Sequence, residues 1–264
     1  MNYSVKHIFL ATLFALLTAC EVIPVGEQMI PVETESTNRT TLIVEFSGLQ
    51  CNNCPLAAEE AHKLLGIYGK NLVVVEMHPA SNDLTASAKP EWDYTCPAAD
   101  EYYNYWNSPN LPYGVINMSF LKPYNEWGAA CLASAALASP VELAHHVQIT
   151  GKTLSLKATI DNLSDSTLNL KYIAWITEDA LIGAQLMPDG KPNLNYEHNH
   201  ILRASITDIW GKALELDSKE STTEEFTYDL PDNVNPTNCN IVGIVMKDNE
   251  AIQVNEYKLK NNIN

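Results

Sequence analysis

Two cysteines separated by two residues, Cys51 and Cys54, are the side chains of this chain best suited to chemistry. Such a pair can exchange with a disulfide, because a thiolate attacks one sulfur atom of the disulfide. The pair follows an apolar, β-branched run over 41–46 and precedes apolar residues at helical spacing over 56–68. The sequence therefore predicts thiols at a strand-to-helix turn, where backbone N–H groups and the helix dipole favour a thiolate at Cys51.

Glu45 is a carboxylate inside the otherwise apolar strand, six residues before Cys51. Burial would raise its pKa and let the carboxyl group exchange protons with Cys54. On an edge strand the same side chain would simply face solvent. The residue types leave both interpretations open.

A zinc site is the competing use of a Cys-x-x-Cys pair, and it requires a second pair of cysteines or histidines at workable spacing. The chain has no second Cys-x-x-Cys, and neither His62 nor His78 completes a paired motif. His198 and His200 would share one face of a strand, as candidate metal ligands or as hydrogen-bonded loop residues. The sequence therefore predicts no metal at the thiols and no cofactor, which leaves thiol exchange or a static disulfide.

The N-terminal region has the features of an export signal. An apolar segment over 8–17 follows a lysine and is too short to span a bilayer as a mature helix, which predicts a signal peptide over 1–19. Its end, Leu-Thr-Ala followed by Cys20, resembles the lipobox of bacterial lipoproteins, with ordinary signal cleavage as the alternative. Residues 20–40 are rich in Pro, Glu, Ser and Thr, which predicts an extended tether behind an acylated Cys20.

Export would expose the cysteines to an oxidising compartment, where Cys51 and Cys54 could persist as a disulfide with no enzymatic role. Of the six cysteines, Cys96, Cys131 and Cys239 then remain. A bridge between Cys96 and Cys131 is possible, but sequence cannot place them within the distance that a disulfide demands. Cys239 is predicted to be a buried free thiol.

The chain is acidic, with 32 Asp and Glu against 16 Lys and Arg and a formal net charge of -16. Such a surface repels nucleic acid and anionic lipid headgroups. We therefore predict no nucleic-acid partner and a membrane contact made by the lipid anchor alone.

The thiol segment resembles the thioredoxin superfamily in its strand, acidic residue, Cys-x-x-Cys pair and following helix. A second strand is predicted over 71–77, and Leu-Pro112-Tyr-Gly-Val-Ile-Asn resembles the cis-proline segment of that family. The resemblance implies that Pro112 shapes a substrate site, with Cys51 attacking, Cys54 resolving and Glu45 managing protons.

The chain departs from thioredoxin between and before the thiols. Asn52 and Asn53 replace the familiar Gly-Pro, and Gln50 stands where a tryptophan is usual. Because the intervening dipeptide tunes thiolate stability and reduction potential, the direction of exchange is left open.

A predicted insertion over 80–110 carries four aromatic residues in one short helix: Tyr102, Tyr103, Tyr105 and Trp106. Tyr102 and Trp106 are spaced to pack on the sheet, with the other two at the surface. The functional alternative is an aromatic-lined groove beside the thiols for an extended peptide or another apolar ligand, with glycan binding a further option.

The chain changes character after a helix predicted over 125–138 and the Ser139-Pro140 hinge. Alternating patterns predict strands over 141–149, 153–161, 168–177, 224–230, 240–246 and 252–259. The fold class is therefore an α/β thioredoxin-like domain over 41–139, followed by an all-β antiparallel sandwich over 140–264.

Several segments resemble the Omp-twenty-eight-related lipoproteins of Gram-negative outer membranes. They are Tyr-Tyr-Asn-Tyr over 102–105, Pro-Tyr-Gly-Val-Ile-Asn over 112–117, Asn-Tyr-Glu-His-Asn-His-Ile-Leu-Arg over 195–203, Asp-Ile-Trp-Gly over 208–211 and Asn-Pro-Thr-Asn-Cys over 235–239. The resemblance covers nearly the whole mature chain. It implies a thioredoxin-like domain joined to a β-sandwich, at the periplasmic or surface face of the outer membrane, with adhesion or receptor function proposed for the family.

Two functional hypotheses follow. The first is a lipid-anchored envelope protein that exchanges thiols with other envelope proteins through Cys51 and Cys54. The second is a non-enzymatic outer-membrane or surface binding and adhesion lipoprotein, in which the same pair is a structural disulfide. Reactivity separates them, because an exchange enzyme needs an accessible thiolate and a structural pair is inert.

Overall fold

The computed structural model describes residues 38–259, which are rich in β-strands. The predicted signal peptide and Cys20 lie outside these residues. The helices are α1 (Cys54–Tyr68), α2 (Pro97–Trp106) and α3 (Trp127–Ala135). The strands are β1 (Thr41–Phe46), β2 (Leu72–Met77), β3 (Tyr113–Ile116), β4 (Phe120–Lys122), β5 (Val141–Thr150), β6 (Thr153–Asn162), β7 (Leu168–Glu178), β8 (Leu181–Leu186), β9 (Pro192–His198), β10 (Ile201–Ser205), β11 (Lys212–Leu216), β12 (Ser221–Asp229), β13 (Cys239–Lys247) and β14 (Glu250–Lys258).

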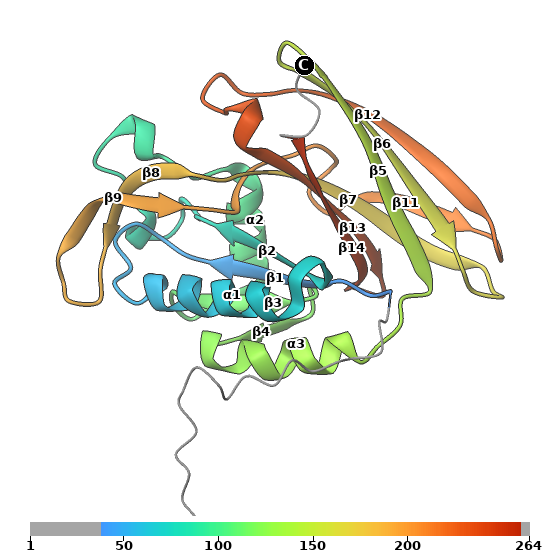
Figure 1. Cartoon of the computed structure of the whole chain (residues 1–264), viewed down its shortest axis with the longest axis horizontal. Helices are drawn as coiled ribbons and strands as arrows, with labels where there is room; N and C mark the ends of the chain where they lie inside the picture. The colour runs from blue at the N-terminus through green and yellow to red at the C-terminus, as the bar shows by residue number, and fades with distance from the viewer. Residues whose placement is uncertain (1–37, 260–264) are drawn as a thin grey trace, which may run out of the picture. The chain divides into compact units, whose positions relative to one another are not determined.

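The largest sheet of the described chain is a mixed sheet of nine strands (Figure 1). Its strand order is β14-β13-β7-β10-β2-β1-β3-β4, and β11 pairs with β7. β1 and β2 run parallel in full register, and β3 is antiparallel to β1. β10 joins the two halves of the chain, because it pairs with β2 on one side and β7 on the other. Strands from both halves of the chain therefore belong to one sheet, and the described residues 38–259 fall in one compact unit.

β1 and β2 are buried along their whole length, as expected for parallel strands covered on both faces. Their side chains alternate between two cores. Ile43 and Val74 pack with α1 and α3, whereas Val44 and Val75 pack with α2. The apolar runs that predicted these strands are thus explained by helices on both sides of the sheet.

A second sheet, β12-β6-β5, is fully antiparallel and packs on β7, β13 and β14. Alternating burial along β5 and β6 gives it one core face and one solvent face. All six strands predicted after residue 140 are present. Four further strands, β8 to β11, were not predicted.

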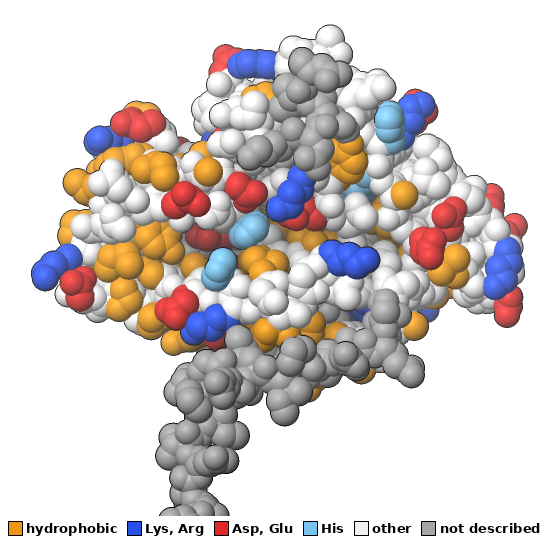
Figure 2. Space-filling view, viewed as in Figure 1, with side chains coloured by type: hydrophobic (Ala, Val, Ile, Leu, Met, Phe, Trp, Pro, Cys, Tyr) orange, Lys and Arg blue, Asp and Glu red, His pale blue; other side chains and the backbone are white. Residues whose placement is uncertain are grey.

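β8 and β9 form a separate hairpin that extends beside the thiol end of the sheet (Figure 1). Hydrophobic side chains gather on this end of the molecule (Figure 2), and those of Ile182 and Leu194 are more than half exposed. The hairpin belongs to the second half of the chain, yet it covers part of the first half.

The start of the described chain is fixed to the folded body. Asn38 exchanges hydrogen bonds with the backbone of Ser139, and the buried Arg39 pairs with Glu250. The last residues of the predicted tether, 38–40, are therefore packed. Among residues 38–259, every helix is too short or too polar to cross a membrane.

Candidate functional site

Cys51 and Cys54 form a disulfide at the first turn of α1, with their Cα atoms 5.4 Å apart. This is the strand-to-helix turn that the sequence predicts. The disulfide is enclosed, because Cys51 is 3% and Cys54 is 2% exposed. The sulfur atoms pack into the core on the α2 face of the sheet.

The β8–β9 hairpin holds the turn that carries the disulfide. The side-chain amide of Gln185 on β8 donates hydrogen bonds to the carbonyl oxygens of Cys51 (2.9 Å) and Gly48 (3.3 Å). The backbone N–H of Leu186 donates to the carbonyl of Leu49 at 2.8 Å. Sequence reasoning missed this cover, since Gln185 lies 134 residues from Cys51.

The loop after β2 covers the same turn from another side. The N–H of Gln50 donates to the carbonyl of Leu84 at 2.7 Å. A Cβ atom on Gly48 would lie 2.6 Å from that carbonyl oxygen, so only glycine allows this close approach. The thiol turn is thus packed against protein on several sides.

Pro112 is buried and follows Leu111 in a cis peptide bond. It precedes β3, whose Tyr113 pairs with Phe46 at the end of β1. Pro112 therefore lies at the same end of the sheet as the disulfide, and its neighbour Leu111 shares the core with both cysteines.

Glu45 is 1% exposed and lies opposite Glu76 in the parallel register of β1 and β2. Burial, and then the negative charge of Glu76, raise the pKa of Glu45 well above its ordinary value. One carboxylate oxygen, Oε1, has no hydrogen-bond partner. Glu45 is buried and does not face solvent, although its role in proton transfer stays a prediction.

Glu76, His78 and His198 form a buried cluster on the α1 side of β1 and β2, where Glu45 also lies. Nε2 of His78 donates a hydrogen bond to Oε1 of Glu76 at 2.7 Å. Burial opposes ionisation of Glu76, but the hydrogen bond and charge of His78 outweigh it and lower the pKa of the carboxyl group. Burial also lowers the pKa of His198 to about 4.

His198 and His200 have different partners. His198 lies with Glu76 and His78 in this cluster. His200 lies beside Asp179, which accepts a hydrogen bond from its backbone N–H at 2.8 Å. The sequence placed His198 and His200 together as candidate metal ligands because they are two residues apart. In the structure, His198 instead clusters with Glu76 and His78, which are far from it in sequence. Glu76 could have been selected from the sequence by one signal: like Glu45, it follows a valine inside an otherwise apolar strand.

Cys96, Cys131 and Cys239 are free and buried, so Cys96 and Cys131 are not bridged. The prediction of a buried free thiol at Cys239 is confirmed. Burial raises the pKa of Cys131 and Cys239 to about 12, which keeps both thiols protonated and unreactive.

A groove of about 860 Å³ lies between α2 and the strands β7 and β11. The rings of Tyr105 and Trp210 meet with centroids 4.6 Å apart, and Trp106 lies 6.2 Å from Trp210. Tyr105 is 60% exposed, while Tyr102 is fully buried and donates a hydrogen bond to the carbonyl of Ile209. A groove beside the thiols was the functional alternative to simple packing of these aromatics, but no cysteine lines this groove.

Trp210 is the groove residue that sequence reasoning did not select as a site. It follows β10 and precedes Gly211, whose φ of 85° favours glycine. Its Nε1 donates a hydrogen bond to Glu101 of α2 at 3.1 Å. The groove therefore needs both halves of the chain.

Comparison with solved structures finds a similar fold in HBP35 of Porphyromonas gingivalis, with a TM-score of 0.69 at 13% identity, over 86% of this chain and 77% of that one. A domain of the outer membrane lipoprotein Omp28 from the same organism matches with a TM-score of 0.33 at 18% identity, over 46% of this chain and 88% of that one. No curated protein sequence matches the chain.

The sequence also matches a known protein family. The matched region is residues 99–263, which is more than half of the chain and includes α2, the groove and the β8–β9 hairpin. The resemblance to this family, and a location at the outer membrane of the cell envelope, are therefore confirmed. The chain belongs to the outer membrane protein Omp28 family.

Proposed function

We propose that this protein is a non-enzymatic, lipid-anchored binding protein of the outer membrane, in which Cys51–Cys54 is a structural disulfide. The observation that carries the proposal is the enclosure of the disulfide beneath the β8–β9 hairpin. Exchange requires a thiolate to reach a sulfur atom, and the two cysteines are only 3% and 2% exposed. For the alternative, thiol exchange, an attacking thiolate would have no open path to the sulfur atoms.

The disulfide would fasten the turn on which the hairpin docks. Gln185 and Leu186 bond to the backbone of this turn, so the turn must keep one conformation for the hairpin to stay in place. In this proposal residues 41–139 have a thioredoxin-like arrangement that serves as a scaffold. Supporting features are the strand, the disulfide at the helix start and the position of Pro112 before β3, at the same end of the sheet.

The groove is the proposed ligand site. It offers the faces of Trp106, Trp210 and Tyr105, and polar groups of Asn169 and Asn249 at its sides. Aromatic faces beside hydrogen-bonding groups suit a ligand with flat apolar faces and polar edges, as sugar rings have. The family match also includes the groove and excludes the cysteine pair.

In this proposal the lipid anchor is Cys20, which is acylated after residues 1–19 are removed. Residues 20–40 then link the anchor to the folded body. The apolar segment and the lipobox-like end support it. Envelope or surface molecules are then the partners within reach of the groove.

An insulin-reduction assay tests the absence of exchange. The full chain, purified in detergent, is expected to leave the rate of insulin reduction by dithiothreitol unchanged, because its disulfide is enclosed. The Cys51→Ser, Cys54→Ser double variant is the matched control and is expected to behave identically. Acceleration by the wild-type chain that the double variant lacks would overturn the proposal and restore thiol exchange.

A further inference from the structure

We propose that Glu76, His78 and His198 bind one divalent transition-metal ion, with zinc as the expected class. The site is independent of the ligand groove and of the proposed function. One carboxylate and two imidazoles are a common ligand set for zinc, and three protein ligands leave a fourth position for water.

The three side chains converge from separate parts of the chain. Glu76 lies on β2, His78 follows that strand, and His198 ends β9 of the covering hairpin. Their ligand atoms all lie within 4.8 Å of one another. Zinc bonds of about 2.0–2.2 Å place ligand atoms roughly 3–4 Å apart, so small side-chain rotations suffice to enclose an ion.

His198 is the observation that a purely structural role leaves unexplained. The side chain is 1% exposed, and neither ring nitrogen has a hydrogen-bond partner of normal geometry. Buried polar groups are nearly always satisfied, and an unsatisfied one requires a specific explanation such as a bound ion. A hydrogen-bonded Glu76–His78 pair would account for those two residues but would leave His198 with only an off-geometry contact to the backbone of Ala184.

The charges nearby favour a cation. Glu45 lies directly across from Glu76, is also buried, and has one carboxylate oxygen without a partner. A divalent ion would compensate the two adjacent carboxylates and give Glu45 a bound water as a hydrogen-bond partner.

Aromatic rings enclose the site and keep its ligands in place. Tyr94 lies 5.1 Å from His198 and 5.8 Å from His78 between ring centroids, and Tyr196 lies 4.8 Å from His198. Such an apolar shell limits water and fixes the orientation of imidazole ligands.

An access route to the site exists. A cavity of about 280 Å³ is lined by Glu45, Glu76 and His198 together with Ala58 and His62 of α1. An ion can therefore reach the cluster from the α1 side without unfolding the hairpin.

Metal titration of the full chain tests this site. Untagged protein in detergent is stripped with a chelator and titrated with Zn²⁺ by calorimetry, and with Co²⁺ by visible absorption. We expect one high-affinity ion per chain and a Co²⁺ spectrum of low coordination number. His198→Gln is expected to lower the affinity at least about 100-fold, since even outer-shell changes cost about 10- to 100-fold.

The matched control is His145→Gln, which changes a half-buried histidine on β5 that bonds to Tyr172 at 3.0 Å. It is expected to bind Zn²⁺ like the wild type. No one-to-one binding by the wild type, or equal affinity of His198→Gln, would overturn the proposal. If circular dichroism shows that His198→Gln does not fold, Glu76→Gln is titrated instead, because it keeps the side-chain size. Zn²⁺ affinity equal to that of the wild type, or a wild-type Co²⁺ spectrum without low coordination number, would then overturn the proposal.

Discussion

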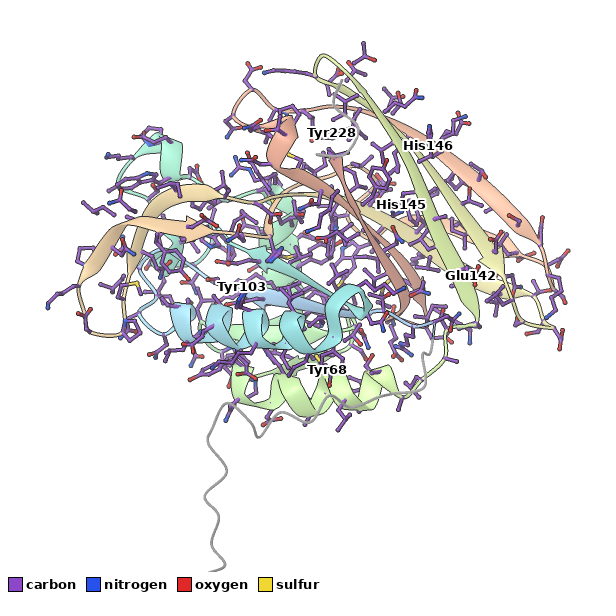
Figure 3. The ribbon with its side chains drawn as sticks, viewed as in Figure 1. Tyr68, Tyr103, Glu142, His145, His146 and Tyr228 are labelled. Atoms are coloured by element: carbon purple, nitrogen blue, oxygen red, sulfur yellow. A yellow bond between two sulfur atoms is a disulfide. The ribbon has the colours of Figure 1, made fainter. Side chains whose placement is uncertain are left out.

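At the scale of single residues, burial opposes protonation of His145. His145 lies on β5 with its Nε2 3.0 Å from the hydroxyl of Tyr172, while its neighbour His146 is exposed on the same strand (Figure 3). Nε2 also lies where a side chain on Gly243 of β13 would be, so the two sheets meet closely here. Burial lowers the pKa of His145 to about 4.

This lowered pKa predicts a loss of stability in acid. An unfolded histidine has a pKa of about 6.5, so below that pH the unfolded chain binds a proton that the folded protein does not. The free energy of unfolding should be unaffected by His145 above about pH 6.5 and should fall as the pH decreases toward about 4. The full effect is at most about 3.4 kcal/mol, from a shift of about 2.5 pKa units at about 1.36 kcal/mol each.

Urea unfolding of the wild type and of His145→Gln at pH 7.5 and pH 4.5 measures this effect. The stability difference between the two proteins is expected to shrink or reverse at pH 4.5, because glutamine does not take up a proton. His146→Gln is the control on the same strand, and its curve should run parallel to the wild type. An equal pH dependence for His145→Gln would show that His145 does not carry the acid sensitivity.

At the scale of elements, the β8–β9 hairpin controls access to the disulfide. Gln185 on β8 is 2% exposed and donates to the carbonyls of Gly48, Cys51 and Leu186. Removing this amide would delete its hydrogen bonds to Gly48 and Cys51, whose carbonyls would keep only the backbone N–H donors of Cys51 and Cys54. Each lost bond costs about 0.5–1.5 kcal/mol. Opening of the hairpin would then become more frequent.

Gln185→Ala should therefore speed the reduction of Cys51–Cys54 by dithiothreitol about 30-fold, since two lost bonds cost about 2 kcal/mol and about 1.4 kcal/mol is a factor of ten. Thiol labelling followed by gel shift gives the rate. Gln148→Ala, an exposed glutamine on β5, is the matched control and should react as slowly as the wild type. Equal rates for Gln185→Ala and the wild type would mean that the hairpin does not limit access.

Sequence patterns predicted the elements that carry strong periodicity and missed those that do not. The wholly apolar runs of β1 and β2 and the alternation of β5 and β6 identify these strands. β9 is mostly exposed and polar, and it gains its structure from pairing with β8. Such strands exist because of tertiary contacts, which no local pattern reports.

The same limit applies to the site. Cys51 and Cys54 are close in sequence, so their position at a helix start was predictable. The neighbours Glu76 and His198 are 122 residues apart and meet only because β10 enters the sheet beside β2. Burial of Glu45 remained undecided for the same reason, since it depends on the sheet order.

At the scale of the whole molecule, the aromatic groove depends on the shared sheet. α2 comes from the first half of the chain, and β7, β11 and Trp210 come from the second. Because β10 joins both halves in one sheet, these walls are held at a fixed distance. The groove is thus a property of the assembled unit Thr34–Asn264 and of neither half alone.

A neutral apolar dye such as Nile red reports whether this groove binds ligands, and a neutral probe avoids repulsion by the net charge of -16. The full chain in detergent should bind the dye saturably above a detergent blank, and Trp210→Ala should weaken binding at least about tenfold, as expected for a central aromatic contact. Phe120→Ala removes an aromatic ring that is 61% exposed outside the groove, and it should leave binding unchanged. If both variants bind the dye as the wild type does, the groove is not the apolar binding surface, and the exposed side chains of the β8–β9 hairpin become the next surface to test.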